Sequence, residues 1–348
     1  MENWTHLSLY ESTDVVRDLF LKRHGRELSL QKAREIVSAF AQGREYFLSA
    51  ANAGMLVRPL LQYYGVLSLS RGLILALEAN LRECALPQSH GLSSHDWNAT
   101  LADLTRPPMD LQAKVTNGTF LSLMESTKNA GTSIIYVGPY PSRLRIYRTM
   151  SIEGLRESTL KFRDILARIP ELREIYERSF GHSAANYRAF VFAISRETLS
   201  TIHLFPGACG LPAESDLRMV LRIPPEAEIQ PEVRYLFVPP GPCQAYSISH
   251  PGGIETSESL PQIDNLSDSS TAIVTPFPDG RTISRIGRLF LLSFFLGTLA
   301  RYHPTNWLST MQSRQAGDAM LPIIRTAMNL IQVQFPELIT QELEGNSS

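Results

Sequence analysis

The chain has 348 residues, of which 43% are hydrophobic and 19% are charged. Its 33 basic and 34 acidic side chains nearly cancel, so bulk charge predicts neither a nucleic-acid nor a membrane partner, and such binding would need a local patch. Three cysteines without a CxxC pair argue against a disulfide framework or a cysteine zinc site. The longest apolar run has about 12 residues, whereas a membrane span needs roughly 20. With no secretory signal at the start of the sequence, we expect a cytoplasmic protein without a membrane partner.

The first hundred residues are predicted to be mainly helical. Apolar residues recur at three- and four-residue spacing after Ser29, which is typical of an amphipathic helix that Ser29 caps and Gly54 ends. Residues 58–77 are apolar on both sides. They therefore predict a buried helix with Pro59 in its first turn.

The middle of the chain has a different character. Short β-branched and aromatic runs separated by Gly and Pro predict a sheet, and residues 160–180 predict two short helices broken at Pro170. Residues 253–270 are rich in Ser and acid and predict a mobile loop. The pattern becomes helical again after Ser284.

This order of segments predicts an α+β fold, in which helical N- and C-terminal segments pack together with a β-rich middle region. The expected boundaries are 1–98 for the N-terminal helical region, 99–278 for the middle region and 279–348 for the C-terminal helical region. No internal repeat is visible in the sequence.

Several blocks of sequence resemble the YaaC-like proteins of bacteria. They are "AREIVSAFAQGREYFLSA", "RPLLQYYGVLSLSRGLIL", "HGLSS" and "GRLFLLSFFLGTLARYHPTNW", in the family's order. The resemblance implies a bacterial protein and an architecture, but no reaction, because the family has no characterised activity.

A weaker resemblance, carried by the amphipathic helix leading into "LLQYYGVLSLSRGLI", is to the HEPN superfamily. It implies a metal-independent ribonuclease in a bacterial stress or defence system. Such enzymes place an Arg and a His on one helix with four to six residues between them, and this chain departs from the pattern. Arg196 and His203 lie in strand-like sequence, and Arg178 to His182 is one residue too short.

Arg71 is the first candidate site residue. On a helix over residues 58–77 it shares a stripe with Leu60, Tyr64 and Leu67, where an unpaired guanidinium would cost several kcal/mol. Its partner is either an internal carboxylate or carbonyl, which makes Arg71 a structural clamp, or an anionic ligand such as a phosphate.

Three more arginines are spaced i, i+4, i+7 in "DGRTISRIGRLF": Arg281, Arg285 and Arg288. Cations at a helix N-terminus oppose the helix dipole, so something negative is expected nearby. The alternatives are a solvated face paired with Asp279 or Glu side chains, and an anion site for phosphate or a nucleic-acid backbone.

The segment "LARYHPTNW" closes the C-terminal core helix. Arg301 and His303 suit a helix C-terminus, and Trp307 is expected to pack over that end. The functional alternative makes His303 a catalytic acid or base with Arg301 as its phosphate partner.

Two further groups of residues have functional alternatives. Arg143 and Arg145 share one face of a predicted strand with Tyr147, which suits single-stranded nucleic acid as well as an ordinary surface. His90 and His95 with Asp96 are weak candidates for metal ligands in a predicted loop, so no metal and no cofactor is expected. The phosphate-loop, HExxH, GxSxG and GxGxxG motifs are missing from the sequence.

The leading hypothesis is a YaaC-like binding or effector protein that recognises an anionic or macromolecular partner, with nucleic acid or another protein as candidates. The alternative is the metal-independent nuclease, with His303 or His90 as acid or base. The sequence gives no prediction of the oligomeric state. The residues assigned to the surface are Arg71, Arg281, Arg285, Arg288, Arg301, His303, Tyr64 and Trp307.

Overall fold

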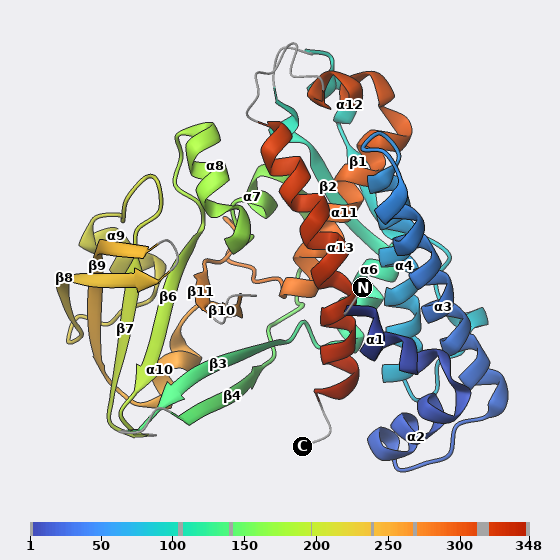
Figure 1. The fold of residues 1–348 in the computed structure, drawn as a ribbon, viewed down its shortest axis with the longest axis horizontal. Coiled ribbons are helices and arrows are strands. Elements are labelled where there is room, and N and C mark those ends of the chain that lie inside the picture. The colour runs from blue at the N-terminus through green and yellow to red at the C-terminus, as the bar shows by residue number, and fades with distance from the viewer. Residues whose placement is uncertain are drawn as a thin grey trace. The chain divides into compact units, whose positions relative to one another are not determined.

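The computed structural model describes residues 3–103, 107–138, 142–195, 197–237, 240–266, 270–311 and 320–345. The chain forms two compact units. Unit 1 comprises residues 1–129, 152–165 and 286–348, and unit 2 comprises residues 130–151 and 166–285. Unit 1 is mainly helical and unit 2 mainly sheet, which confirms the α+β prediction (Figure 1).

Unit 1 is built from helices at both ends of the chain and a small sheet. Its helices are α1 (Asn3–Leu7), α2 (Thr13–His24), α3 (Leu30–Asn52), α4 (Arg58–Leu77), α5 (Trp97–Leu101), α6 (Thr119–Ser126), α12 (Pro304–Met311) and α13 (Met320–Glu344). Two helices meet the unit boundary, α7 (Phe162–Leu166) and α11 (Arg285–Tyr302). Short 3-10 turns cover Ser8–Glu11, Glu83–Ala85 and Pro108–Asp110.

Helices α3 and α4 pack side by side (Figure 1). Ser29 caps α3 as predicted, because its hydroxyl accepts the Lys32 N–H at 3.3 Å, and the helix ends at Asn52, two residues before Gly54. A side chain would not fit at Gly43, where an added Cβ would lie 2.5 Å from Leu69. Small residues therefore allow the two backbones to approach closely.

Helix α4 is buried on most of its circumference and joins the two ends of the chain. The Gln62 amide donates to the Met328 carbonyl of α13 at 2.8 Å, and Arg23 of α2 donates to the Glu342 and Leu343 carbonyls at the end of α13. The predicted packing of the N- and C-terminal helices is confirmed. Among the described helices, α4 alone has the length and hydropathy of a membrane span, and 72% of that stretch is buried as in a core helix.

A three-stranded antiparallel sheet completes unit 1, in the order β1 (His90–His95), β2 (Gln112–Gly118) and β5 (Thr159–Lys161). The prediction of a loop around His90 was wrong, since these residues form β1. Strand β1 has little apolar character of its own, and its pairing with β2 supplies the backbone hydrogen bonds.

Unit 2 contains an eight-stranded sheet with the order β10-β11-β6-β7-β9-β8, to which β3 and β4 are added through β6. Its strands are β3 (Gly131–Val137), β4 (Ser142–Arg148), β6 (Asn186–Ala193), β7 (Leu199–Phe205), β8 (Glu228–Phe237), β9 (Pro240–Pro251), β10 (Gln262–Asn265) and β11 (Thr271–Val274). Strand β3 is parallel to β6, and the other pairs are antiparallel.

The helices of unit 2 are short: α8 (Arg173–Phe180), α9 (Glu214–Val220) and α10 (Ile254–Ser259). A 3-10 turn at Pro170–Leu172 separates α7 from α8, which confirms the predicted break at Pro170. The loop predicted over residues 253–270 was wrong for residues 253–266, which contain α10 and β10, and residues 267–269 lie outside the described residues. Two of its polar side chains bond each other, since the Gln262 amide N–H donates to buried Asp264 at 2.8 Å.

Candidate anion-binding site

The C-terminal end of α11 carries an exposed arginine between aromatic rings. The guanidinium of Arg301 donates to the Tyr64 hydroxyl at 2.7 Å. Its central carbon lies 5.8 Å from the centre of the Tyr64 ring and 4.8 Å from that of Tyr302. Among the described residues Arg301 forms no ion pair with a carboxylate. Its charge is therefore held by a phenol and two ring faces and stays available to an anion.

Helices α3 and α4 supply the tyrosines next to this arginine. Tyr46 stacks on Tyr64 with ring centres 5.6 Å apart. Tyr63 is only 5% exposed, and its hydroxyl has no hydrogen-bond partner among the described residues. Burial raises the pKa of Tyr63, so this hydroxyl stays protonated. A buried polar group without a partner costs free energy, which a bound polar ligand or water could recover.

Strand β1 brings a histidine to the same place. The His90 ring lies 5.4 Å from the Tyr63 ring, centre to centre. Burial lowers the pKa of His90, and the positive charge of Arg301 lowers it further. The imidazole is therefore neutral near pH 7 and has one nitrogen free of a proton.

These six residues form one cluster in unit 1, called here the tyrosine–arginine site: Tyr46, Tyr63, Tyr64, His90, Arg301 and Tyr302. Chemically, it offers one permanent cation, a neutral imidazole, a phenol that can donate, and exposed ring faces. This set suits an anion attached to a planar group, such as a nucleotide. The carboxylate ligands that a hard metal ion needs are missing from this cluster.

The other predicted residues at this end of α11 pack nearby. His303 is half-buried against the Trp97 ring, with centres 5.7 Å apart, and burial lowers its pKa. Trp307 of α12 is 1% exposed. Within the described part of the chain, no ring contact or hydrogen bond links His303 to Arg301. The structure brings Arg301 together with His90 instead.

Arg71 lies outside this cluster. It is half-buried, and its guanidinium donates to the Pro87 carbonyl at 3.0 Å in the segment between α4 and β1. The sequence allowed a carboxylate, a carbonyl or a ligand as its partner, and the described partner is a carbonyl.

The three arginines near the start of α11 do not share one helix face, because α11 begins only at Arg285. Arg281 precedes the helix and pairs with Asp279. Arg288 is 1% exposed.

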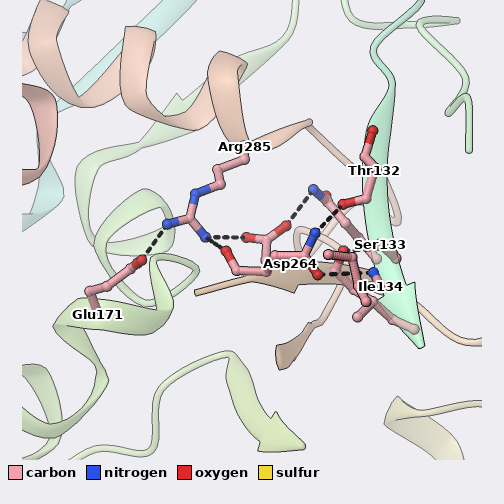
Figure 2. A network of polar contacts seen from close by, with 9 residues as sticks. Thr132, Ser133, Ile134, Glu171, Asp264 and Arg285 are labelled. Atoms are coloured by element: carbon pink, nitrogen blue, oxygen red, sulfur yellow. Dashed lines mark hydrogen bonds and ion pairs between the residues drawn. The ribbon is translucent and has the colours of Figure 1, made fainter. Parts of the chain in front are cut away.

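Figure 2 shows Arg285 inside a polar network of unit 2. Its guanidinium pairs with Glu171, donates to the Asn265 carbonyl at 2.7 Å and lies 3.8 Å from the Asp264 carboxylate. Asn265 in turn bonds the backbone of β3 at Thr132 and Ile134. Arg285 itself belongs to unit 2, and its charge is already compensated by two carboxylates of that unit.

The remaining candidates are dispersed. His95 and Asp96 pair with each other at 3.3 Å, and within the described residues no three His, Cys, Asp or Glu side chains gather as a metal site would require. Arg196 lies outside the described residues, and His203 pairs with Glu232 at 2.6 Å on the sheet of unit 2. The Arg196–His203 spacing therefore gives no described Arg–His pair.

Sequence reasoning missed Tyr46, Tyr63 and Tyr302 and gave His90 only a weak role. The sole signal in the sequence was the abundance of aromatic residues near Arg58 and Arg301. The contacts that join them run between α3, α4, β1 and α11, which are up to 256 residues apart between Tyr46 and Tyr302.

The fold and site define a two-unit α+β protein whose helical unit displays an arginine among aromatic rings. The family model for the YaaC-like protein matches residues 8–343, nearly the whole chain. The chain therefore belongs to the YaaC-like family. No significant match was found among curated proteins or among solved structures.

Proposed function

We propose that this protein is a binding or effector component that recognises a phosphate-bearing ligand, with nucleic acid as the leading class, at the tyrosine–arginine site. The observation that carries the proposal is Arg301, an exposed guanidinium held by the Tyr64 hydroxyl and without a carboxylate partner among the described residues. Arginine binds phosphate through paired N–H donors, and the adjacent rings suit a base.

Anion binding would also use the buried groups of the site. The Tyr63 hydroxyl can donate to a ligand oxygen, and His90 can take up a proton when an anion offsets the charge of Arg301. Both groups would gain an interaction with the anion, so they favour an anion over a neutral ligand of the same shape.

The test is fluorescence anisotropy with labelled 20-nucleotide single-stranded RNA and DNA, titrated at several salt concentrations, for the wild-type protein and Arg301→Gln. We expect Arg301→Gln to weaken binding by about tenfold, in the range of one charge-assisted hydrogen bond. Arg17→Gln removes an exposed charge on α2 and serves as the control. Equal affinities for all three proteins would refute the proposal.

A metal-independent nuclease is the second candidate. It is favoured by His90, a neutral imidazole beside both Tyr63 and the charge of Arg301. In such a reaction His90 would accept the proton of the ribose 2′-hydroxyl as its oxygen bonds to phosphorus, and Arg301 would stabilise the negative charge on the phosphoryl oxygens. The bond from phosphorus to the 5′ oxygen breaks, and that oxygen leaves with a proton from water. The test is incubation with the same RNA in EDTA. Cleavage lost in His90→Gln and kept in His303→Gln would establish this activity at this site, and intact RNA would reject it without affecting the binding proposal.

A further inference from the structure

The sheet of unit 2 has one covered and one open face. On the covered face, Ile135, Val191 and Ile202 belong to an apolar cluster. Leu217 of α9 and Leu221, the C-cap residue of α9, belong to the same cluster. Side chains alternate along a strand, so the residues next to these point to the opposite face. That face carries a row of aromatic and basic groups.

Four neighbouring strands each contribute one side chain to this row. Arg143 of β4 lies over the Tyr136 ring of β3 at 5.9 Å, Tyr136 stacks on Phe190 of β6 at 4.8 Å, and Phe190 stacks on His203 of β7 at 6.2 Å. Strand pairing sets the row, since Tyr136 lies opposite Arg143 and Phe190 opposite His203. The strands β3, β4, β6 and β7 can be followed in Figure 1.

The row is exposed to solvent at its basic end, on β4, and at Phe190 of β6. Phe190 is 38% exposed, and Ile194 just beyond β6 is 48% exposed on the same side. Arg143 and Arg145 are both exposed, and neither forms an ion pair with a carboxylate among the described residues. An exposed ring beside uncompensated cations offers a nucleic acid a face for base stacking and charges for its backbone.

The same face turns acidic at its far edge. Glu228 and Glu232 of β8 lie on this side, and Glu232 holds His203 at 2.6 Å. A polyanion would be repelled there, so the favourable area is confined to β4, β3 and β6. This arrangement of charges and rings favours a ligand that has a row of negative groups with aromatic groups next to them.

We infer that the open sheet face of unit 2 binds single-stranded nucleic acid. Bases pack on Tyr136 and Phe190, and the backbone phosphates contact Arg143 and Arg145. Arg143 has only the Tyr136 ring as a described partner, so it can turn to a phosphate and release the outer face of that ring to a base. A duplex buries its base faces in its own stack and cannot make these contacts. The inference does not rest on the function proposed for unit 1.

The experiment uses the full chain and three labelled probes: dT20, U20 and a 20-base-pair DNA duplex. Phe190→Ala removes the exposed ring, Phe190→Trp keeps an aromatic face, and Arg143→Gln/Arg145→Gln removes the charges. The matched controls are Met219→Ala, an exposed apolar residue on α9, and Arg17→Gln/Arg156→Gln, which removes two exposed charges from unit 1. Circular dichroism confirms that each variant is folded.

We expect Phe190→Ala to weaken single-strand binding by about 5- to 150-fold, the range for loss of one stacked base, and Phe190→Trp to restore it. The double arginine variant should lower the salt slope of log K by about 1.4, at about 0.7 per phosphate contact. The controls should bind as the wild type, and the duplex should bind more weakly than either single strand.

Three results would overturn the inference: no binding of either single strand, wild-type binding by Phe190→Ala, or equal binding of duplex and single strand. If Arg301→Gln abolished binding while Phe190→Ala did not, the sheet would lose its role and the proposal for unit 1 would stand. The reverse result would leave the sheet as the nucleic-acid surface and refute the proposal for unit 1.

Discussion

Replacement of Glu177 by Ala should strongly destabilise unit 2. The Glu177 side chain is 0% exposed and pairs with the buried Arg173 guanidinium at 3.2 Å. It also accepts the backbone N–H groups of Ala184 at 3.1 Å and Cys209 at 3.2 Å. Among the described residues, the substitution leaves Arg173 with the Phe205 carbonyl as its remaining hydrogen-bond acceptor. An uncompensated buried charge costs about 3–5 kcal/mol, a large part of the roughly 5–15 kcal/mol that stabilises a domain.

A double variant separates the charge from the backbone contribution. Arg173→Met/Glu177→Leu removes both charges, and a buried ion pair can often be replaced by apolar residues at little cost. The two amides stay without their acceptor, at about 1–3 kcal/mol for each that remains buried. The double variant should therefore be more stable than Glu177→Ala and less stable than the wild type.

Urea unfolding followed by far-ultraviolet circular dichroism gives the free energies, and hydrogen exchange gives the location. We expect faster exchange of the Ala184 and Cys209 amides in both variants. An unfolding midpoint of Glu177→Ala equal to that of the wild type would refute the reasoning, because the carboxylate would then contribute nothing to the fold.

Three further predictions concern unit 1. Gly297→Ala should lower the free energy of unfolding by about 1–3 kcal/mol through overpacking, because the added Cβ would lie 2.7 Å from the Tyr63 Cβ. Gly54 has open space around it, so Gly54→Ala should not lower this free energy. Thermal unfolding of the two variants makes the comparison. Ligand affinity at the tyrosine–arginine site should rise as the pH falls below 6.5, the ordinary pKa of histidine, because a bound anion raises the lowered pKa of His90. Anisotropy titrations at several pH values measure this affinity. An affinity independent of pH in the wild type, or the same pH dependence in His90→Gln, would contradict the prediction. Burial lowers the pKa of Lys32 to about 8 from its ordinary 10.5, so the unfolded chain holds more protons between these values and the free energy of unfolding should rise there with pH. The urea midpoints of the wild type and of Lys32→Met would be measured across this pH range. The difference between the two midpoints should increase with pH, and a constant difference would show that Lys32 is not the cause.

The helices were predictable where periodicity and local chemistry agree. The Ser29 cap and the Pro170 break depend on residues a few positions away, so the sequence contains the whole interaction. Strands β1 and β10 were missed because polar residues obscure the strand pattern, and their backbone pairing with β2 and β11 depends on residues outside each strand. Asp264, for instance, is buried beside Arg285, which a local pattern cannot reveal.

The candidate site was predictable only in part. Arg301 was singled out with His303 at the C-terminus of a core helix, and Tyr64 because it shares a stripe with Arg71 on the predicted helix over residues 58–77. Their hydrogen bond joins residues 237 positions apart, and no local rule gives that pairing. His90 could not be chosen over His303 from the sequence, because the choice depends on which ring β1 brings against Tyr63.

The two ends of the chain belong to the same unit, and this has a consequence for synthesis on the ribosome. Helix α4 is complete after 77 residues, but its partner α13 begins only at Met320. During translation the apolar surface of α4 must therefore wait until the 242 residues between the two helices have emerged. We expect nascent chains that stop before α13 to be held by chaperones, and a ribosome stalled there to carry a unit 1 that is not yet closed.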